Sequence, residues 1–312
     1  MRNNLVVVMD DISAINIVKD TSFAMLLEGQ RRGYRLWYLG DTDLFLDGAV
    51  VHARMRPVTV RDDPSDWFEL GAPITRPLGE DDLVLMRSDP PVDTNYLMAT
   101  YLLERAETAG AKVVNRPQAL RDFNEKLAIA HFPDLIPDTL VSADAASLRD
   151  FVGRAGRAVL KPLDGMGGKS VFLSEDGDRN LNVIIETLTD SGQRLAMAQE
   201  YLPAIDQGDK RILLVHGKPI EYLLARIPGQ EDFRGNLARG GRGEGQPLGE
   251  ADRRIAATVG PVLLEHGIEF AGLDVIGDRL TEVNVTSPTC VRELDAQFGI
   301  NISGELFDAI DP

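Results

Sequence analysis

The stretch Lys161-Pro-Leu-Asp-Gly-Met-Gly-Gly-Lys-Ser170 carries the strongest local signal in the chain. An apolar strand expected over 158–161 leads into it, and a second strand over 170–173 leads out, which predicts a hairpin instead of a strand-to-helix turn. Glycines let backbone N–H groups approach phosphate oxygens closely. Short glycine motifs also occur in ordinary hairpin turns, so the stretch alone leaves both interpretations open.

Two familiar phosphate-binding motifs do not fit this loop. A P-loop needs glycine five residues before the glycine of Gly168-Lys169-Ser170, and Leu163 stands there. A dinucleotide-binding fingerprint that begins at Gly165 needs glycine at position 170, where the chain has serine. Lys161 ends the apolar strand, which places its ammonium near the loop mouth, where it would neutralise phosphate charge.

Four short apolar strands come before the loop, with helices between them. Thr21 or Ser22 is a suitable N-cap for the first helix, and Gly110 ends the second. Alternating strands and helices predict an α/β layer with a parallel sheet. The expected strands are 5–9, Arg35–Leu39, 83–86 and Lys112–Val114, and the second helix covers 94–109.

The chain after the loop reads as hairpins around one helix. A strand over 196–199 runs towards Tyr201, and strands over 211–215 and 219–226 flank the turn 216–218. A glycine-rich segment over 228–243, a helix over 250–266 and a last hairpin over 271–284 follow. The domain boundary is expected near residue 123, which divides the chain into domains 1–123 and 124–312.

The hairpin Gly272-Leu-Asp-Val-Ile-Gly-Asp-Arg-Leu-Thr-Glu-Val-Asn284 is the second strong signal. Glu282 and Asn284 lie on one face of a strand, because the side-chain period is two. A three-residue turn over 277–279 would place Asp274 opposite Glu282. Three oxygen-bearing side chains on one face suit Mg²⁺, while a merely solvated polar face is the ordinary alternative.

Several other residues are candidates for ligand binding only if the fold brings them together in one site. Arg87 follows a strand at its carboxyl end, where α/β sheets bind ligands, and Arg211, Arg226 and Arg234 are suited to bidentate contacts with carboxylates or phosphates. The segment Thr286-Ser-Pro-Thr-Cys290 offers hydroxyls, although such turns are common in any fold. Cys290 is expected to be a buried structural thiol. The four histidines show no metal-ligand spacing.

Composition restricts the classes of function. The net charge of −16 and sequence pI of about 4.7 argue against general nucleic-acid binding. A single cysteine excludes an intrachain disulfide. We expect neither a signal peptide nor a membrane span, because no apolar run is long enough. These features predict a cytoplasmic protein with no nucleic-acid or membrane partner.

Eight motifs spread along the chain belong together. They are Met9-Asp-Asp-Ile-Ser-Ala-Ile-Asn-Ile17, Leu85-Met-Arg-Ser-Asp-Pro-Pro91, Asn115-Arg-Pro-Gln-Ala-Leu-Arg-Asp-Phe-Asn-Glu-Lys126, Leu160–Gly168, Gly208-Asp-Lys-Arg211, Leu224-Ala-Arg-Ile227, Arg234-Gly-Asn236 and Thr281-Glu-Val-Asn-Val-Thr-Ser-Pro-Thr289. In these motifs and their spacing, nearly the whole chain resembles the prokaryotic glutathione synthetase family. Together the motifs are highly specific, whereas the glycine loop and acidic hairpin alone indicate only the wider ATP-grasp superfamily.

The resemblance implies a Rossmann-like domain over 1–123 followed by a two-lobed ATP-grasp fold, with an ATP-lid lobe over 124–202 and a metal and substrate lobe over 203–312. It implies a ligase that joins γ-glutamylcysteine to glycine with ATP and two Mg²⁺ ions, for which Mn²⁺ can substitute. Relatives carry a small residue at position 169, so no phosphate contact is assigned to Lys169. Family members are often tetramers, which implies a homo-oligomer.

The resemblance also implies a role for each site residue. The adenine would lie near Glu200, Tyr201 and Leu202, and Lys126 and Lys161 would contact the phosphates. The other ATP-binding residues would be Asp164, Gly165, Met166, Gly167, Gly168 and Asp209. The metal ligands would be Asp274, Glu282 and Asn284, with Glu282 bridging the two ions. Arg87, Arg211, Arg226, Ser287 and Thr289 would hold the dipeptide, and Arg234 and Asn236, in a lid over 228–243, would close over it. Arg211 and Arg234 would act in catalysis.

The chemistry expected of such a site is carboxylate activation. ATP would phosphorylate the cysteinyl carboxylate of γ-glutamylcysteine, and the amine of glycine would attack the acylphosphate. Two alternatives stay open at this point. One is another ATP-grasp ligase, such as a D-alanine–D-alanine or glutamate-adding enzyme, and the other is a non-catalytic ATP-binding module. Retention of a full set of metal ligands argues against the second alternative.

Overall fold

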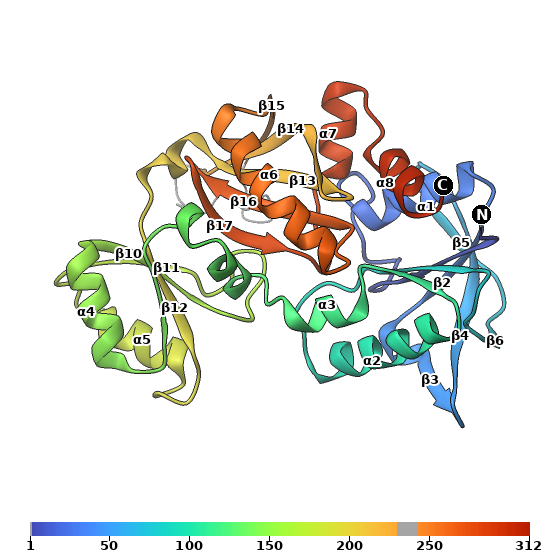
Figure 1. Cartoon of the computed structure of the whole chain (residues 1–312), viewed down its shortest axis with the longest axis horizontal. Coiled ribbons are helices and arrows are strands. Elements are labelled where there is room, and N and C mark those ends of the chain that lie inside the picture. The colour runs from blue at the N-terminus through green and yellow to red at the C-terminus, as the bar shows by residue number, and fades with distance from the viewer. Residues whose placement is uncertain (1, 230–241) are drawn as a thin grey trace.

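The computed structural model of the chain describes residues 2–229 and 242–312. Within that part, three sheets lie along the long axis of the molecule (Figure 1). The first belongs to the N-terminal part of the chain. The second carries the glycine-rich loop, and the third, which lies between the other two, carries the acidic hairpin.

The predicted parallel strands are present and form the centre of the first sheet. β1 pairs in parallel with β2 on one side and β7 on the other, and β7 pairs in parallel with β8. Their apolar residues are buried on both faces, as expected for parallel strands covered by helices. The strands are β1 (Asn4–Val8), β2 (Arg35–Leu39), β7 (Asp82–Met86) and β8 (Lys112–Val114), and the helices are α1 (Thr21–Arg31), α2 (Thr94–Thr108) and α3 (Pro117–Asp122).

The prediction that Thr21 or Ser22 caps α1 is wrong. Asp20 is the N-cap, and its Oδ1 accepts a hydrogen bond of 2.6 Å from the N–H of Phe23. Both hydroxyl residues already lie inside the helix and are buried. The Oγ of Ser22 instead accepts a hydrogen bond from Nε of Arg87.

An antiparallel extension of the first sheet was not predicted from residues 40–82. β4 (Val50–Val60) pairs antiparallel with β2 and with three short strands, and its burial alternates along most of its length. That alternation is the expected signal of a half-buried strand, but Pro57 within the run weakens it. The other elements are η1 (Asp41–Asp43), β3 (Leu44–Asp47), β5 (Phe68–Leu70) and β6 (Ile74–Pro77).

The second sheet confirms the predicted hairpin around the glycine-rich loop. β10 (Arg157–Pro162) and β11 (Phe172–Glu175) are antiparallel neighbours, although β11 begins two residues later than expected. Two helices pack against one face and form a separate apolar cluster. The remaining elements are η2 (Leu127–His131), η3 (Pro133–Leu135), β9 (Thr139–Ser142), α4 (Ala145–Ala155), α5 (Leu181–Thr189) and β12 (Ala196–Glu200).

The third sheet consists of antiparallel strands in the order β15-β14-β13-β16-β17. His216 and Gly217, both with positive φ, form the two-residue turn between β13 and β14, the geometry that matches strand twist. Its elements are η4 (Pro203–Gln207), β13 (Asp209–Val215), β14 (Lys218–Ile227), β15 (Arg242–Pro247), α6 (Glu250–Glu265), β16 (Phe270–Ile276) and β17 (Arg279–Asn284).

The last two helices, α7 (Val291–Phe298) and α8 (Ile302–Ile310), return to pack on α1. Asp311, beyond α8, accepts hydrogen bonds from the backbone N–H of Arg2 and the hydroxyl of Tyr34, so the two ends of the described chain lie together. The carboxyl end of the protein thereby fixes the first sheet against the third.

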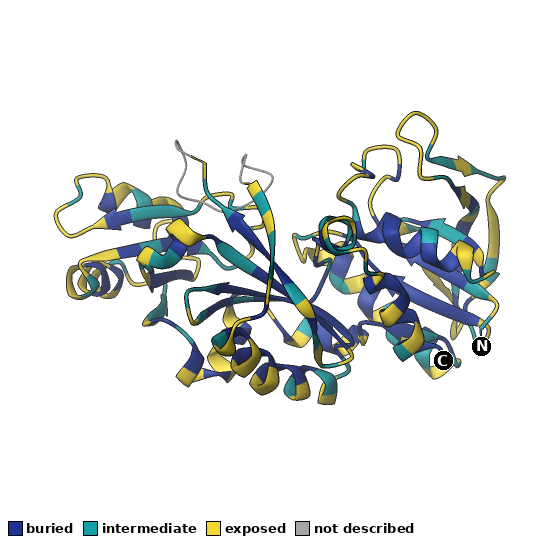
Figure 2. Ribbon diagram, turned by 90° about the horizontal axis from the view of Figure 1, so that it is seen from above, coloured by how far each residue is buried: buried dark blue, intermediate teal, exposed yellow. Residues whose placement is uncertain are grey.

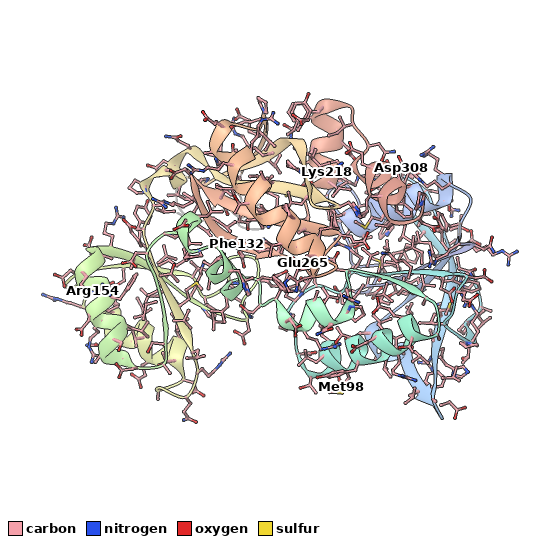
Figure 3. The ribbon with its side chains drawn as sticks, in the orientation of Figure 1. Met98, Phe132, Arg154, Lys218, Glu265 and Asp308 are labelled. Atoms are coloured by element: carbon pink, nitrogen blue, oxygen red, sulfur yellow. The ribbon has the colours of Figure 1, made fainter. Side chains whose placement is uncertain are left out.

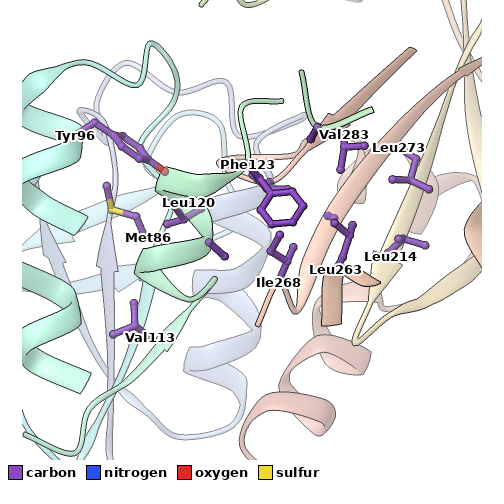
Figure 4. Packing of buried hydrophobic residues seen from close by; sticks show 14 of the residues in the cluster. Met86, Tyr96, Val113, Leu120, Phe123, Leu214, Leu263, Ile268, Leu273 and Val283 are labelled. Atoms are coloured by element: carbon purple, nitrogen blue, oxygen red, sulfur yellow. The ribbon is translucent and has the colours of Figure 1, made fainter. Parts of the chain in front are cut away.

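Continuous packing joins these layers. A single apolar cluster runs from Met86 and Tyr96 through Phe123 to Ile268, before β16, and to Leu273 of the third sheet (Figure 4). The strands are mostly buried and the outer helix faces are exposed (Figure 2). Asn115, just after β8, adds hydrogen bonds to the backbone of Phe270 and Val285. No described helix is long and apolar enough to cross a membrane.

Candidate active site

A cavity of about 330 Å³ lies where the second and third sheets meet the loop that follows β7. Its walls hold charged, hydroxyl and apolar side chains from all three parts of the chain. Most of the residues singled out from the sequence line it. These are Lys126, Lys161, Gly165, Met166, Gly167, Gly168, Glu200, Tyr201, Leu202, Asp209, Arg211, Arg226, Asp274, Glu282, Asn284, Ser287 and Thr289.

The acidic hairpin has the predicted face but a different turn. Asp274 lies opposite Glu282, and Gly272 lies opposite Asn284, so the three oxygen-bearing side chains share one side of the sheet. The predicted three-residue turn is wrong, because Ile276 pairs with Arg279 across a two-residue turn. A bulge beside Asp274 adds one residue to β17 and restores the expected opposition.

A buried network of ion pairs forms the wall on the third sheet. Arg211 donates to Asp274 through Nε at 2.5 Å and through Nη2 at 3.1 Å. Nη2 of Arg226 lies 2.9 Å from Oδ2 of Asp274 and donates to Asp209 at 2.5 Å. Burial alone would raise the pKa of Asp274, but the two guanidinium groups outweigh it and hold the pKa below its ordinary value.

Asp209 differs from Asp274 although both contact Arg226. Burial raises the pKa of Asp209 to about 6, and the nearby Asp274 charge acts in the same direction, while Arg226 opposes both. Oδ1 of Asp209 is buried and accepts no hydrogen bond in the described structure. A buried acceptor without a donor is costly, so this oxygen is open to a donor from a ligand.

Two lysines approach the hairpin from the side of the glycine-rich loop. Nζ of Lys126 lies 2.9 Å from Oε1 of Glu282 and also contacts the carbonyl oxygen of Gly165. Lys161 is buried, has no carboxylate within ion-pair distance among the described residues, and reaches only the carbonyl of Thr281 at 3.5 Å. Burial lowers the pKa of Lys161 to about 8, although Glu282 partly opposes it.

The glycine-rich loop lies close to its own backbone. A Cβ on Gly165 would come within 2.8 Å of Pro162 and 3.3 Å of the carbonyl oxygen of Lys169, which explains glycine at that position. Gly167 has φ of +58° and Gly168 has φ of +70°, a region that suits glycine. Lys169 also lines the cavity.

The opposite end of the cavity is more apolar. Val159, Leu202, Ile205 and Ile276 line it together with Tyr201, whose ring lies under the guanidinium of Arg157 at 4.2 Å. Flat apolar walls beside a strand end are suited to a planar base. The predicted adenine region at 200–202 therefore lies at this end.

Four predicted residues do not line the cavity in the described structure. Arg87 is buried behind it and donates to the carbonyl oxygen of Pro288 at 3.0 Å and to Ser22. Asp164 pairs at 2.6 Å with Arg194, on the outer side of the loop. Arg234 and Asn236, with most of the segment 228–243, lie outside the described residues.

Glu125 is a cavity residue that sequence reasoning missed. Its Oε1 accepts from the N–H groups of Val285 and Thr286 and from the Thr286 hydroxyl, at 2.8–3.0 Å. Burial raises the pKa of Glu125, and the charge of Glu282 acts in the same direction. Its position directly before Lys126 was the available signal, since that lysine was already a candidate.

Cys290 also lines the cavity, as a buried residue without a general base beside it among the described residues. Burial raises the pKa of its thiol despite the nearby Arg211 and Arg226. A raised pKa lowers the fraction of thiolate, which argues against a nucleophilic role. The interpretation of Cys290 as a structural thiol agrees with this geometry.

The oxygens of the hairpin are compatible with a hard divalent cation. No group of three or more His, Cys, Asp or Glu side chains in the described part is arranged around a common metal position. Asn284 uses its Nδ2 to donate to Gly272, which leaves its Oδ1 available, and only Oε1 of Glu282 is engaged. Both oxygens of Asp274 already accept from arginines. This set suits Mg²⁺, which takes few protein ligands plus substrate phosphates.

The charges that line the cavity nearly cancel. Five cationic side chains face six carboxylates, so the protein alone does not favour a highly charged anion through net charge. A nucleoside triphosphate would need added cations to neutralise its charge, which is the usual role of divalent ions at phosphate sites. The residues are Lys126, Lys161, Lys169, Arg211 and Arg226, against Asp89, Glu125, Glu200, Asp209, Asp274 and Glu282.

Two family models match the chain. Residues 4–121 match the model described as prokaryotic glutathione synthetase, N-terminal domain, and residues 125–299 match prokaryotic glutathione synthetase, ATP-grasp domain. The chain is 60% identical over 311 residues to a glutathione synthetase of Xanthomonas campestris pv. campestris, which covers 100% of this chain and 98% of that protein. It is 58% identical to one of Yersinia pestis, over 98% of this chain and 96% of the relative.

Solved structures share the fold at low identity. D-cycloserine synthetase DcsG superposes with a TM-score of 0.68 at 15% identity, over 98% of each chain. The ATP-grasp ligase PsnB in complex with minimal precursor, Mg and ADP has a TM-score of 0.61 at 18% identity, over 99% of this chain and 97% of that one. These similarities confirm the predicted fold class, a Rossmann-like domain followed by an ATP-grasp fold.

Proposed function

The chain belongs to the prokaryotic glutathione synthetase family, and from this premise we propose how its main cavity performs the reaction. The protein is an ATP-grasp ligase that makes glutathione from γ-glutamylcysteine and glycine, with ATP and a divalent metal. The observation that carries the proposal is one cavity in which a glycine loop, two lysines and the oxygen-bearing hairpin face a buried arginine pair.

ATP binds across the second and third sheets in this proposal. The adenine lies at the apolar end beside Glu200, Tyr201 and Leu202, and the phosphates lie between Lys126 and Lys161 under the glycine-rich loop. Both the loop and the two lysines line that part of the cavity, which supports the assignment. The unpaired Oδ1 of Asp209 accepts a hydrogen bond from the nucleotide.

Asp274, Glu282 and Asn284 would hold two Mg²⁺ ions, and Mn²⁺ would be able to replace Mg²⁺. The ions supply charge neutralisation for the triphosphate and for the group that is transferred. Asp274 would share its oxygens with Arg211 and Arg226, since both arginines already donate to it.

The dipeptide lies between the third sheet and the loop after β7. Arg211 and Arg226 hold its reacting carboxylate, and Ser287 and Thr289 hold its other polar groups; all four side chains line the cavity. Arg87 lies behind them and donates to the carbonyl of Pro288, so we propose that it acts on the dipeptide by positioning the 287–289 turn or after a change of rotamer. Arg234 and Asn236 stay predictions from the sequence.

The first bond forms between the cysteinyl carboxylate and the γ-phosphorus of ATP, with ADP as leaving group. Arg211, fixed by its two hydrogen bonds to Asp274, stabilises the charge that develops on the transferred group. The amine of glycine then attacks the acylphosphate carbon and phosphate leaves. A site with its cations already in place needs little reorganisation at each step.

The domain boundary, the cellular location and the oligomeric state are also part of the proposal. We propose a domain division between residues 123 and 124, because the first sheet ends at Val114 and the second begins at Thr139. A cytoplasmic location suits a chain with one cysteine.

We also propose a homo-oligomer, which is supported by exposed apolar side chains on β3 and α2. Among them are Leu46, Tyr101 and Met98, and Met98 is seen on the outer face of α2 in Figure 3. Sedimentation velocity tests it, and a monomer at all concentrations contradicts it.

The test of the function is substrate-dependent ADP release with γ-glutamylcysteine and a panel of amino acids. Glycine should give the highest kcat/KM and yield glutathione. Turnover with D-alanine pairs or with glutamate as acceptor, but none with γ-glutamylcysteine, would instead assign the chain to another class of ATP-grasp ligase. ATP binding without any acceptor-dependent turnover would indicate a non-catalytic module.

A further inference from the structure

Lys126 connects the two sides of the main cavity. Its Nζ lies 2.9 Å from Oε1 of Glu282 on the acidic hairpin and also donates to the carbonyl oxygen of Gly165 in the glycine-rich loop. The Lys126 side chain is 7% exposed and that of Glu282 is 22% exposed, so water screens the pair only in part. One ammonium group therefore holds a carboxylate of the hairpin and the backbone of the loop at the same time.

The backbone of Lys126 is fixed by contacts with both sides of the cavity. Oδ1 of Asn124 accepts a hydrogen bond of 3.2 Å from the N–H of Lys126, and Nδ2 of Asn124 donates to the carbonyl oxygen of Leu163, at the start of the glycine-rich loop. The carbonyl oxygen of Glu125 accepts a hydrogen bond from the N–H of Val283, in β17. A lysine side chain has a flexible four-carbon stem, so its ammonium can change partner while this backbone stays in place.

Lys126 and a divalent cation would compete for Glu282. Among the three proposed metal ligands, Asp274 already accepts from arginines through both oxygens, and Asn284 offers only a neutral oxygen. Glu282 is the remaining carboxylate, and its one ion-pair partner among the described residues is Lys126. The ammonium occupies Oε1, and its positive charge also repels a dication placed at Oε2. Metal binding and the Lys126–Glu282 pair therefore oppose each other.

A phosphate group would remove this opposition, because it offers Lys126 a second anion. Lys161 lines the same cavity, and no described carboxylate lies within ion-pair distance of it. Burial lowers the pKa of Lys161, and the positive charge of Lys126 acts in the same direction, so the two ammonium groups repel each other. An anion that lies between the lysines is attracted by both and relieves this repulsion.

We propose that Lys126 is an internal counter-ion, which occupies the metal-binding carboxylate of Glu282 until nucleotide phosphate draws its ammonium away. The proposal rests on the function proposed above, since it concerns how the metal and ATP of that reaction enter their site. Without phosphate, a divalent cation has to displace the ammonium from Glu282. With phosphate, the ammonium moves to the new anion and releases the carboxylate. Metal binding thus depends on nucleotide, through a contact within the protein.

Lys126→Met tests the proposal with Mn²⁺ alone as the probe. Methionine has a similar length but no charge, so Glu282 loses the ammonium that competes with the metal. In the absence of nucleotide, the variant should bind Mn²⁺ at least ~10-fold more tightly than wild type, measured by electron paramagnetic resonance of free Mn²⁺. Far-UV circular dichroism shows whether the variant is folded. An Mn²⁺ affinity within ~2-fold of wild type, or weaker, would overturn the proposal.

Two matched variants separate the ion pair from a general effect of charge. Lys126→Arg keeps a cation beside Glu282 and should bind Mn²⁺ as weakly as wild type. Lys169→Met removes another lysine of the cavity wall, one without a carboxylate at ion-pair distance in the described structure, and should change Mn²⁺ affinity less than ~3-fold. A gain in Lys169→Met or in Lys126→Arg as large as that in Lys126→Met would overturn the role of the Lys126–Glu282 pair.

The dependence on nucleotide is measured with a saturating non-hydrolysable ATP analogue, adenylyl imidodiphosphate. Water-proton relaxation distinguishes Mn²⁺ bound to the protein from Mn²⁺ bound only to free nucleotide, because the protein complex tumbles more slowly. The analogue should strengthen Mn²⁺ binding to wild type by a larger factor than to Lys126→Met, in which Glu282 is already released. Equal factors in the two proteins would overturn the proposal. Absence of Mn²⁺ binding from every protein, even with the analogue, would instead contradict the proposed function.

Discussion

The two walls of the main cavity differ in how their charges are balanced. On the third sheet, Arg211, Arg226, Asp209 and Asp274 form a buried network of ion pairs before any ligand arrives, although Oδ1 of Asp209 has no donor in the described structure. On the side of the glycine-rich loop, Lys126 pairs with Glu282, but Lys161 lines the cavity without a carboxylate at ion-pair distance in the described structure. The arginines are therefore paired before a ligand binds, whereas Lys161 gains an anionic partner only from the ligand.

This difference implies different roles: the paired side chains position the reacting groups, and the unpaired lysine binds phosphate. A buried network holds its side chains in one geometry but is strongly destabilised when one partner is removed. An unpaired buried lysine costs stability in the free protein and gains a partner only when phosphate is present. Substitutions on the paired wall should therefore change kcat and stability, and those on the loop side should change mainly the affinity for ATP.

Glu282→Gln should have the largest effect, because it removes a charge from the hairpin face that would hold the metal ions. Loss of charge stabilisation for a transferred phosphoryl group should lower kcat at least ~100-fold. Steady-state kinetics at saturating Mg²⁺ measure it. Asp278→Asn, in the exposed turn of the same hairpin, is the control and should keep normal turnover. Near-normal turnover of Glu282→Gln would contradict the metal assignment.

Arg211→Lys sharpens the comparison on the paired wall. Lysine keeps the charge but has a single nitrogen, so it lacks the planar geometry in which Nε and Nη2 of Arg211 bind the two oxygens of Asp274. We expect kcat to fall ~10- to 100-fold and the melting temperature to fall by several degrees, as for a disturbed buried pair. The control is Arg253→Lys, because its solvent-exposed ion pair with Glu221 should contribute little to stability. Equal effects of the two substitutions on kcat and melting temperature would contradict the claim that the buried network positions the reacting groups.

Lys161→Met should have a smaller effect, which is confined to the affinity for ATP. Its removal should raise KM for ATP ~10-fold with little loss of stability, whereas Lys169→Met, on the exposed part of the loop, should change it less than ~3-fold. The pKa of Lys161 is lowered to about 8, so its charge is present below that pH and lost above it. Wild-type affinity for ATP should therefore decline as pH rises through 8, and Lys161→Met should lack this decline. Parallel pH profiles would contradict the assignment.

Much of the architecture was predictable from local patterns. The parallel strands, the hairpin around the glycine-rich loop and the third-sheet hairpins follow from apolar runs with glycine at the turns. The opposition of Asp274 and Glu282 was predicted with the wrong turn, because a bulge inside β17 compensates for the shorter turn. A bulge of this kind depends on neighbouring strands and leaves no local mark.

Other features depend on contacts between distant segments. Asp20 caps α1, while the hydroxyls of Thr21 and Ser22 accept hydrogen bonds from the backbone N–H of Val291 and from Nε of Arg87. Glu125 acquires its role from the backbone of 285–286, some 160 residues later. No pattern within a short window of sequence reveals such partners.

The central claim is that the paired wall presents the cysteinyl carboxylate of γ-glutamylcysteine for phosphorylation by ATP. The most direct test uses dipeptide labelled with ¹⁸O in that carboxylate, followed by mass spectrometry of the phosphate released on reaction with glycine. The account predicts that each phosphate carries one oxygen from the carboxylate and that ADP is the nucleotide product. Phosphate without label, or release of AMP and pyrophosphate, would contradict it.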